Sequence, residues 1–298
     1  MEKTPHKEKL DAALRNPKCG DEDRALLAEA RTHYDQWIKD AGELTSQGPE
    51  KVREMTALLN RYKDVLEVEL IAKHGSPFIK RQKGQMKLDN SILEEFLIHL
   101  IDPVIISGLP EGLELAVGPT RAFMSLSFNP SNLAALGEKP SVVVKMKDQD
   151  FIVGKEIHYK FSPDANFSAE TTASGVIPLA VLAAECKVNL DKTMFQEASG
   201  TAARLKQGCP HALYFVLNEY LDMAPEDCRL TAVDNVYLLR HAKRLPFEKR
   251  NKYAEVRKQR DAHPIDPDVL LRFVENIGSF LNAVWYDPDA AIQRGSFV

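Results

Sequence analysis

The feature that most constrains the fold is an apolar run near the middle of the chain, followed at once by charge. Residues 176–184 carry no charged side chain, and Glu185, Cys186 and Lys187 come directly after them. A run of this length and composition predicts a buried central strand, although periodicity alone leaves a helix open. Because side chains alternate along a strand, Glu185 and Lys187 would share one side of the sheet, about 7 Å apart. Charges at the end of a buried strand need a partner or a metal to offset their desolvation.

Length, charge and cysteine usage limit the classes of protein to consider. The chain has 298 residues, enough for one large domain or two small ones. Its net charge of −4 and sequence pI of about 6.1 give no overall sign of a nucleic-acid partner, so any basic surface must be local. Four scattered cysteines predict reduced thiols in a cytoplasmic protein. No stretch reaches the roughly 18 apolar residues of a membrane span, so we expect no membrane partner.

Helical and strand patterns follow each other in an order typical of an α/β protein. Apolar residues recur at helical spacing over 21–38, 49–73, 90–101, 191–207 and 268–285. Short or alternating patterns predict strands over 113–117, 122–128, 142–147, 155–161, 176–187 and 212–217. We expect a mixed central sheet flanked by helices, with the last strand parallel to its neighbour. The expected divisions are a helical N-terminal region (1–89), a core (90–225) and a basic, helical C-terminal region (226–298).

A second acidic residue precedes the central strand. Pro163-Asp164 follows the alternating segment 155–161, and Glu185 comes 21 positions after Asp164, at the end of the next strand. Two carboxylates at strand ends would form a hard-oxygen site that suits Mg²⁺ and, without imidazole or thiolate ligands, does not suit zinc. Such an ion would bind a phosphodiester oxygen and lower the pKa of a coordinated water. Lys187, its pKa lowered by burial and by the metal, would orient that water and accept its proton.

Pro163-Asp164 and Glu185-Cys186-Lys187 together resemble the motif of the PD-(D/E)xK nuclease superfamily. The resemblance implies a restriction-endonuclease-like core, with Asp164, Glu185 and the carbonyl of Cys186 as ligands of Mg²⁺ and with Lys187 assisting the nucleophile. It also implies hydrolysis of one strand of duplex DNA to 5′-phosphate and 3′-hydroxyl ends. Residues 185–194 are similar to type II restriction endonucleases of the BbvCI kind, which use two different subunits. The implied partners are duplex DNA and a second, identical or related subunit, in a homodimer or a heterodimer.

Basic and polar residues outside the motif are candidates for DNA contact. Lys192 and Gln196 lie one helical turn apart after the central strand, and nine lysines and arginines fall between Arg240 and Arg260. A solvated helix and a phosphate-binding surface explain this basic segment equally well. A basic loop at 74–88 is a further candidate, as is Asn129 for base reading. The residues that we expect at DNA are Arg121, Lys192, Gln196, Lys243, Arg244, Lys249 and Arg250.

Two other interpretations compete with a site-specific nuclease. A repair or recombination nuclease of the same superfamily would share the motif but select DNA by its structure. In a non-enzymatic helical interaction protein, Glu185 would form a structural ion pair with Lys187 or Lys192. Glu170, and Glu94 or Glu95 of the helix at 90–101, are alternative acidic ligands.

Overall fold

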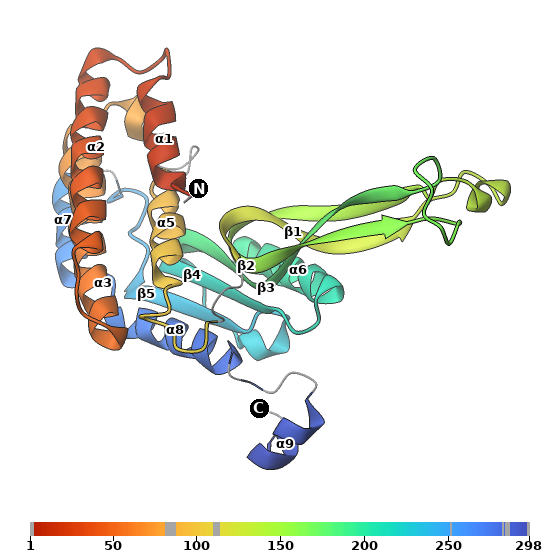
Figure 1. The fold of residues 1–298 in the computed structure, drawn as a ribbon. Coiled ribbons are helices and arrows are strands. Elements are labelled where there is room, and N and C mark those ends of the chain that lie inside the picture. Colours follow the sequence, from red (N-terminus) through yellow and green to blue (C-terminus); the bar gives the residue numbers. More distant parts are fainter. Residues whose placement is uncertain are drawn as a thin grey trace. The chain divides into compact units, whose positions relative to one another are not determined.

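The computed structural model describes residues 3–80, 88–109, 114–250, 252–281, 283 and 287–296, and is drawn in Figure 1. The chain forms two compact units. The first comprises 1–5, 93–98 and 114–238, and the second comprises 6–92, 99–113 and 239–298. Residues 81–87 of the expected basic loop at 74–88 lie outside the described residues, as does the end of the helix expected at 268–285.

The first unit is built on the expected mixed sheet. The strands are β1 (Ala116–Phe128), β2 (Val142–Phe161), β3 (Ala173–Leu190), β4 (Leu213–Leu221) and β5 (Asn235–Lys243), and they lie side by side in sequence order. β1–β2 and β2–β3 pair antiparallel, whereas β3–β4 pair parallel as expected. The apolar run at 176–184 lies inside β3, so its strand prediction is confirmed. β5 lies in the C-terminal region that the sequence predicts to be basic and helical, so that prediction missed a strand.

Helix α6 (Lys192–Gly208) covers one face of this sheet. Asp191 caps it by accepting a hydrogen bond from the Met194 N–H at 2.9 Å. At its other end, a Cβ on Gly208 would lie 2.8 Å from the Met124 carbonyl oxygen, so close packing on β1 requires glycine there. The core between helix and sheet includes Ala122, Ile152, Ala183, Phe195, Ala198, Ala202, Leu205, Tyr214 and Val216. Helix α5 (Asn90–Leu100) and the short 3-10 turns η2 (Ala134–Gly137) and η3 (Cys228–Leu230) precede or connect the strands.

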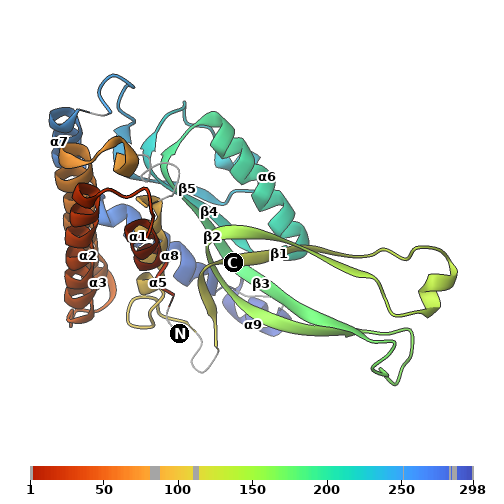
Figure 2. The same ribbon diagram turned by 90° about the horizontal axis from the view of Figure 1, so that it is seen from above.

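Strand β2 bends sharply in its middle. The rings of Phe128, which ends β1 opposite Val142, and Phe161, which ends β2, lie 5.2 Å apart in an edge-to-face contact. A straight strand would separate Val142 and Phe161 by roughly 60 Å, so β2 must fold back. The two connections, 129–141 and 162–172, accordingly project to the same side in Figures 1 and 2. Pairing shifts register within 149–154, between Gln149 and Ile152 against β1 and between Val153 and Gly154 against β3, which places the bend there.

The bend depends on a glycine. A Cβ on Gly154 would come within 2.1 Å of the Leu179 carbonyl oxygen, so no other residue fits where β2 crosses β3. The strands expected at 142–147 and 155–161 are therefore the two halves of one bent strand. Asp150 lies at the start of this bend.

The second unit is helical. It contains most of α1 (Pro5–Leu14), then α2 (Asp21–Gly42), α3 (Gly48–Asp64), the π-helix η1 (Val65–Ala72), α7 (Tyr253–Ala262), α8 (Pro267–Leu281) and α9 (Pro288–Arg294). The rings of Trp37 and Tyr62 stack at 5.0 Å between α2 and α3. The helices expected at 21–38 and 49–73 are confirmed. Within the described residues, no helix combines the length and apolarity needed to cross a lipid bilayer.

The basic segment from Arg240 to Arg260 is not a single solvated helix. It comprises the end of β5, a connection and most of α7. Arg240 and Arg260 are only 1% and 3% exposed, which the sequence did not indicate. Arg240 donates to the His263 carbonyl oxygen at 3.0 Å, so it serves the fold of this unit.

A buried ionic group joins η1 to α3 and α7. Glu67 and Lys63 are fully buried, with 2.6 Å between Lys63 Nζ and Glu67 Oε1, and Arg260 donates to the other carboxylate oxygen of Glu67. Glu69, two positions away, meets Arg257 of α7 at 2.9 Å but is 34% exposed. Both glutamates thus accept from an arginine of α7, one buried and one near solvent.

These two glutamates give a matched test of the buried group. Glu67→Gln leaves two buried cations without their counter-charge, so we expect a loss of about 3–5 kcal/mol in the free energy of unfolding. Glu69→Gln weakens two solvent-screened pairs, with Arg257 and with Lys73, and should cost about 1 kcal/mol. Urea unfolding of the two variants measures both values. Equal losses would mean that the buried group does not hold α7 in place.

Candidate active site

The candidate site lies where β2 and β3 separate. Their ladder ends at the pair Phe151–Ala184, so Asp150 and Glu185 are the first residues beyond it on each strand. From there β2 continues against β1, whereas β3 continues only against β4, with Lys187 opposite Asn218. Two strands that diverge leave room between them for side chains and for a ligand. The bend of β2 therefore creates the opening at which these charged residues meet.

Three side chains converge at this opening. Lys187 Nζ lies 3.0 Å from Glu185 Oε2 and 3.6 Å from Asp150 Oδ2. The same Asp150 oxygen accepts a hydrogen bond from the Cys186 N–H at 3.1 Å, which ties the Asp150 side chain across to β3. The exposed fractions are 12%, 14% and 20% for Asp150, Glu185 and Lys187, so the group is mostly buried yet open to solvent on one side. Two carboxylates and one ammonium leave a net charge of −1.

The electrostatics of the group keep Lys187 charged. Burial alone would lower the pKa of Lys187, but the charges of Asp150 and Glu185 outweigh burial and raise this pKa above its ordinary value. The lowered pKa expected from the sequence assumed a metal bound beside Lys187, whereas the two carboxylates by themselves have the opposite effect. At neutral pH the protein groups therefore present Lys187 as a hydrogen-bond donor.

Strand β4 supplies polar contacts behind the three residues. The Tyr214 hydroxyl donates to Glu185 Oε1 at 2.6 Å, and Tyr214 is fully buried. Burial, and then the neighbouring charge of Glu185, raise the pKa of Tyr214, so its hydroxyl stays protonated. Asn218 is fully buried opposite Lys187, and its Oδ1 has no hydrogen-bond partner among the described residues. The site thus contains an acceptor able to receive a bond from a water or a ligand.

Asp164 is not part of this group, which corrects the sequence prediction. It lies in the connection between β2 and β3, and the last pair before that connection is Phe161–Ala173. Eleven residues of β3 separate Ala173 from Ala184, a distance of roughly 35 Å. In an antiparallel hairpin, the end of one strand and the end of the next are necessarily at opposite ends. Asp164 instead shapes its own turn, accepting from the Asn166 N–H at 3.0 Å.

Asp150 takes the place expected of Asp164, and the sequence contained one signal for it. Asp150 directly precedes the buried residues Phe151, Ile152 and Val153, so it too is a charge at the border of an apolar strand segment. The alternating charges at 145–150 concealed this border, and Pro163-Asp164 matched the motif more closely. Glu170 lies in the same distant connection as Asp164, whereas Glu94 and Glu95 are buried on α5.

The donors at the opening fit a hard divalent cation. Asp150 and Glu185 offer carboxylate oxygens, and the buried thiol of Cys186 points to the other face of the sheet because side chains alternate along β3. No group of three or more His, Cys, Asp or Glu residues able to hold a metal is found in the described ranges. Mg²⁺ is commonly held by one or two carboxylates and completed by waters and phosphate oxygens, so two carboxylates suffice.

The residues of the first unit that we expect to contact DNA are exposed to solvent. Lys192 begins α6, 68% exposed and 3.9 Å from Glu226, and Gln196 is exposed one turn later. Arg121 on β1 is 67% exposed and lies 3.4 Å from Asp148. It lines a hollow of about 940 Å³ between the β1–β2 hairpin and α6, together with Lys145, Lys147, Arg204 and Gln207. Basic side chains therefore outnumber acidic ones around Arg121.

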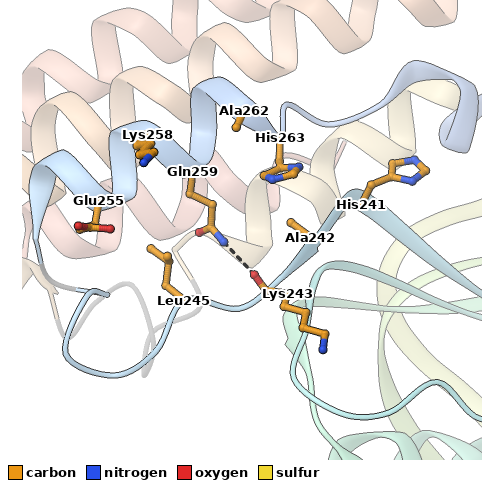
Figure 3. A pocket seen from close by; sticks show the side chains of 9 residues that line it. All are labelled: His241, Ala242, Lys243, Leu245, Glu255, Lys258, Gln259, Ala262 and His263. Carbon is orange, nitrogen blue, oxygen red and sulfur yellow. Dashed lines mark hydrogen bonds between the residues drawn. The ribbon is translucent and has the colours of Figure 1, made fainter.

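The residues of the second unit that we expect to contact DNA lie at the end of β5 and in the connection that follows it. Lys243 ends β5 and lines a pocket of about 390 Å³ against α7 (Figure 3), where its carbonyl accepts from Gln259 at 2.8 Å. His241 in the same pocket has φ = 47° and meets Asp266 at 2.8 Å. Lys249 lies 3.3 Å from Glu255, and Arg250 donates to the Leu245 carbonyl oxygen at 2.7 Å. Arg244 is partly exposed at the start of the connection to α7.

Comparisons with known proteins agree with this architecture. A solved structure described as "native BbvCI A2B2 tetramer at low resolution" superposes with a TM-score of 0.64, at 20% identity, over 94% of this chain and 97% of that chain. At this identity the likeness establishes the shared fold. Comparison with curated proteins finds no match.

A sequence match identifies the family. The profile of the Bpu10I restriction endonuclease family covers residues 85–297, which include both sides of the opening between β2 and β3. The resemblance to restriction endonucleases seen in the sequence is confirmed. The chain belongs to the Bpu10I restriction endonuclease family and is a type II restriction endonuclease.

Proposed function

We propose that the chain is a Mg²⁺-dependent subunit that hydrolyses one strand of duplex DNA at a specific site, leaving 5′-phosphate and 3′-hydroxyl ends. The observation that carries this proposal is the convergence of Asp150, Glu185 and Lys187 where β2 and β3 diverge. A divalent cation held by Asp150 and Glu185 would bring positive charge to the opening, where it would complement the negative charge of a phosphodiester. Family membership supports DNA as the substrate.

Each residue of the group has a role in this proposal. Asp150 and Glu185 would hold the Mg²⁺, with the Cys186 carbonyl as a third oxygen donor. The bound ion would stabilise charge on the phosphate and lower the pKa of a coordinated water. Lys187, displaced from the carboxylates by the ion, would donate to the attacking water or to a phosphate oxygen and hold it in line.

The proposal that each active site cuts one strand also implies that the enzyme has more than one subunit. A double-strand break needs two such sites, and therefore a second copy or a related subunit. The solved BbvCI protein is described as an A2B2 tetramer, which favours a related second subunit for this chain.

A cytoplasmic location fits the proposed function. The substrate would be DNA, and all four cysteines are free thiols, as is usual in the reducing cytoplasm.

The decisive comparison uses two aspartates. Asp150→Asn removes a carboxylate of the metal site, so cleavage of plasmid DNA in Mg²⁺ should fall by at least about 10²-fold. Asp164→Asn changes only a distant turn and should leave cleavage unchanged. The assay follows nicked and linear plasmid, with the chain alone and with a related subunit added. DNA ligase should reseal the nicks if they carry 5′-phosphate and 3′-hydroxyl ends.

The opposite pattern, with Asp164→Asn inactive and Asp150→Asn active, would reject this site. Cutting at DNA junctions, or smeared products in place of discrete fragments, would favour a repair nuclease. No metal-dependent cleavage in any subunit mixture would favour the structural ion pair of an interaction protein.

If the basic residues contact DNA phosphates, replacing one of them should change how strongly DNA binding depends on salt concentration. Arg121→Gln removes one cation from the hollow on β1, so the slope of log K against log salt for DNA binding should shrink by about 1. Lys39→Gln is the matched control, because Lys39 on α2 is 64% exposed and lies near Glu43. Binding is measured with Ca²⁺ in place of Mg²⁺. An unchanged slope for Arg121→Gln would exclude this residue from the DNA surface.

A further inference from the structure

The two oxygens of Glu185 have different partners. Oε2 lies 3.0 Å from Lys187 Nζ, whereas Oε1 accepts from the Tyr214 hydroxyl at 2.6 Å. Tyr214 comes from β4, where it pairs with Ala183, two residues before Glu185 on the same face. The tyrosine ring belongs to the buried core under α6, so its position is fixed by packing. One oxygen of Glu185 is thus held from behind by a rigid donor, and the other faces the opening.

Thr201 of α6 lies beside the Tyr214 hydroxyl. Its side chain is 2% exposed, its hydroxyl donates to the Glu197 carbonyl oxygen at 2.9 Å, and Lys147 Nζ of β2 donates to its Oγ1. The proton of Thr201 is therefore already donated elsewhere, and the Tyr214 hydroxyl donates its own single proton to Glu185.

From this geometry we infer that Tyr214 is a positioning residue that fixes the rotation of the Glu185 carboxylate and so presents Oε2 to the divalent cation. The inference rests on the proposed function, because it concerns the ligand that Glu185 provides. Hydrogen bonds to metal-binding carboxylates typically change metal affinity 10–100-fold. Without its donor, the Glu185 carboxylate is free to rotate or to keep both oxygens on Lys187.

A purely structural role for Tyr214 predicts a different outcome. The ring fills space in the core, and Tyr214→Phe retains the ring while removing only the hydroxyl. If packing were the whole contribution, this variant would behave like any other buried Tyr→Phe change. Tyr237 on β5 offers that comparison, since it is 3% exposed and packs its ring on Phe215 at 5.5 Å.

The experiment measures Mn²⁺ binding to the full-length protein. Mn²⁺ is titrated up to millimolar concentration, and binding is followed by the loss of the electron paramagnetic resonance signal of the free ion. We expect Tyr214→Phe to weaken Mn²⁺ binding about 10-fold or more, and Tyr237→Phe to leave it unchanged. The Mg²⁺ concentration for half-maximal cleavage should rise by a similar factor in Tyr214→Phe, with the rate recovering at high Mg²⁺. DNA affinity in Ca²⁺-free buffer should not change, because Tyr214 is buried.

Asp150→Asn separates this inference from the proposed function. If Asp150→Asn loses Mn²⁺ binding but Tyr214→Phe binds Mn²⁺ as the wild type does, the positioning role is rejected and the metal site stands. If Asp150→Asn also binds Mn²⁺ normally, the proposed function fails. Equal losses in Tyr214→Phe and Tyr237→Phe would likewise overturn the inference, because they would reflect general damage to the core.

Discussion

The divergence of β2 from β3 is the constraint on which the site depends. An uninterrupted ladder would pair Asp150 with Glu185 backbone to backbone and leave no space between them. The fold-back of β2, permitted by Gly154, ends the ladder at Phe151 and Ala184 instead. The Asp150 carboxylate then replaces the lost pairing by accepting from the Cys186 N–H. A backbone irregularity and a charged side chain therefore compensate for each other, and the result is a polar opening in an otherwise apolar sheet.

Buried charge is used differently in the two units. In the second unit, Glu67 is enclosed with Lys63 and Arg260, so the ionic group connects helices and has no access to solvent. At the opening in the first unit, the carboxylates of Asp150 and Glu185 share one ammonium and remain 12–14% exposed. Here two carboxylates lie beside one ammonium at an opening that solvent reaches. Such a group gains stability from an added cation, as expected of a metal-binding site and not of a structural ion pair.

Much of the fold was accessible from the sequence, because apolar periodicity reports burial directly. The run at 176–184 predicted the central strand, and Glu185 and Lys187 at its end were placed together as expected. The position of the second acid depends on which ends of β2 and β3 adjoin, and the apolar border at Asp150 does not reveal this by itself. A loop of unknown geometry between two strands leaves the pairing register open, so the motif match at Pro163-Asp164 outweighed the signal at Asp150. Burial of Arg240 and Arg260 was missed because their partners are distant in sequence.

The central claim is that Asp150 and Glu185 bind a divalent cation at the opening between β2 and β3. Crystals of the protein soaked with Mn²⁺ test it most directly, because anomalous scattering locates the metal without reference to activity. The account predicts a peak about 2.2 Å from oxygens of both carboxylates, with Lys187 moved aside. A peak at the 162–172 connection, or a structure in which Mn²⁺ binds elsewhere and Lys187 keeps both carboxylates, would contradict it.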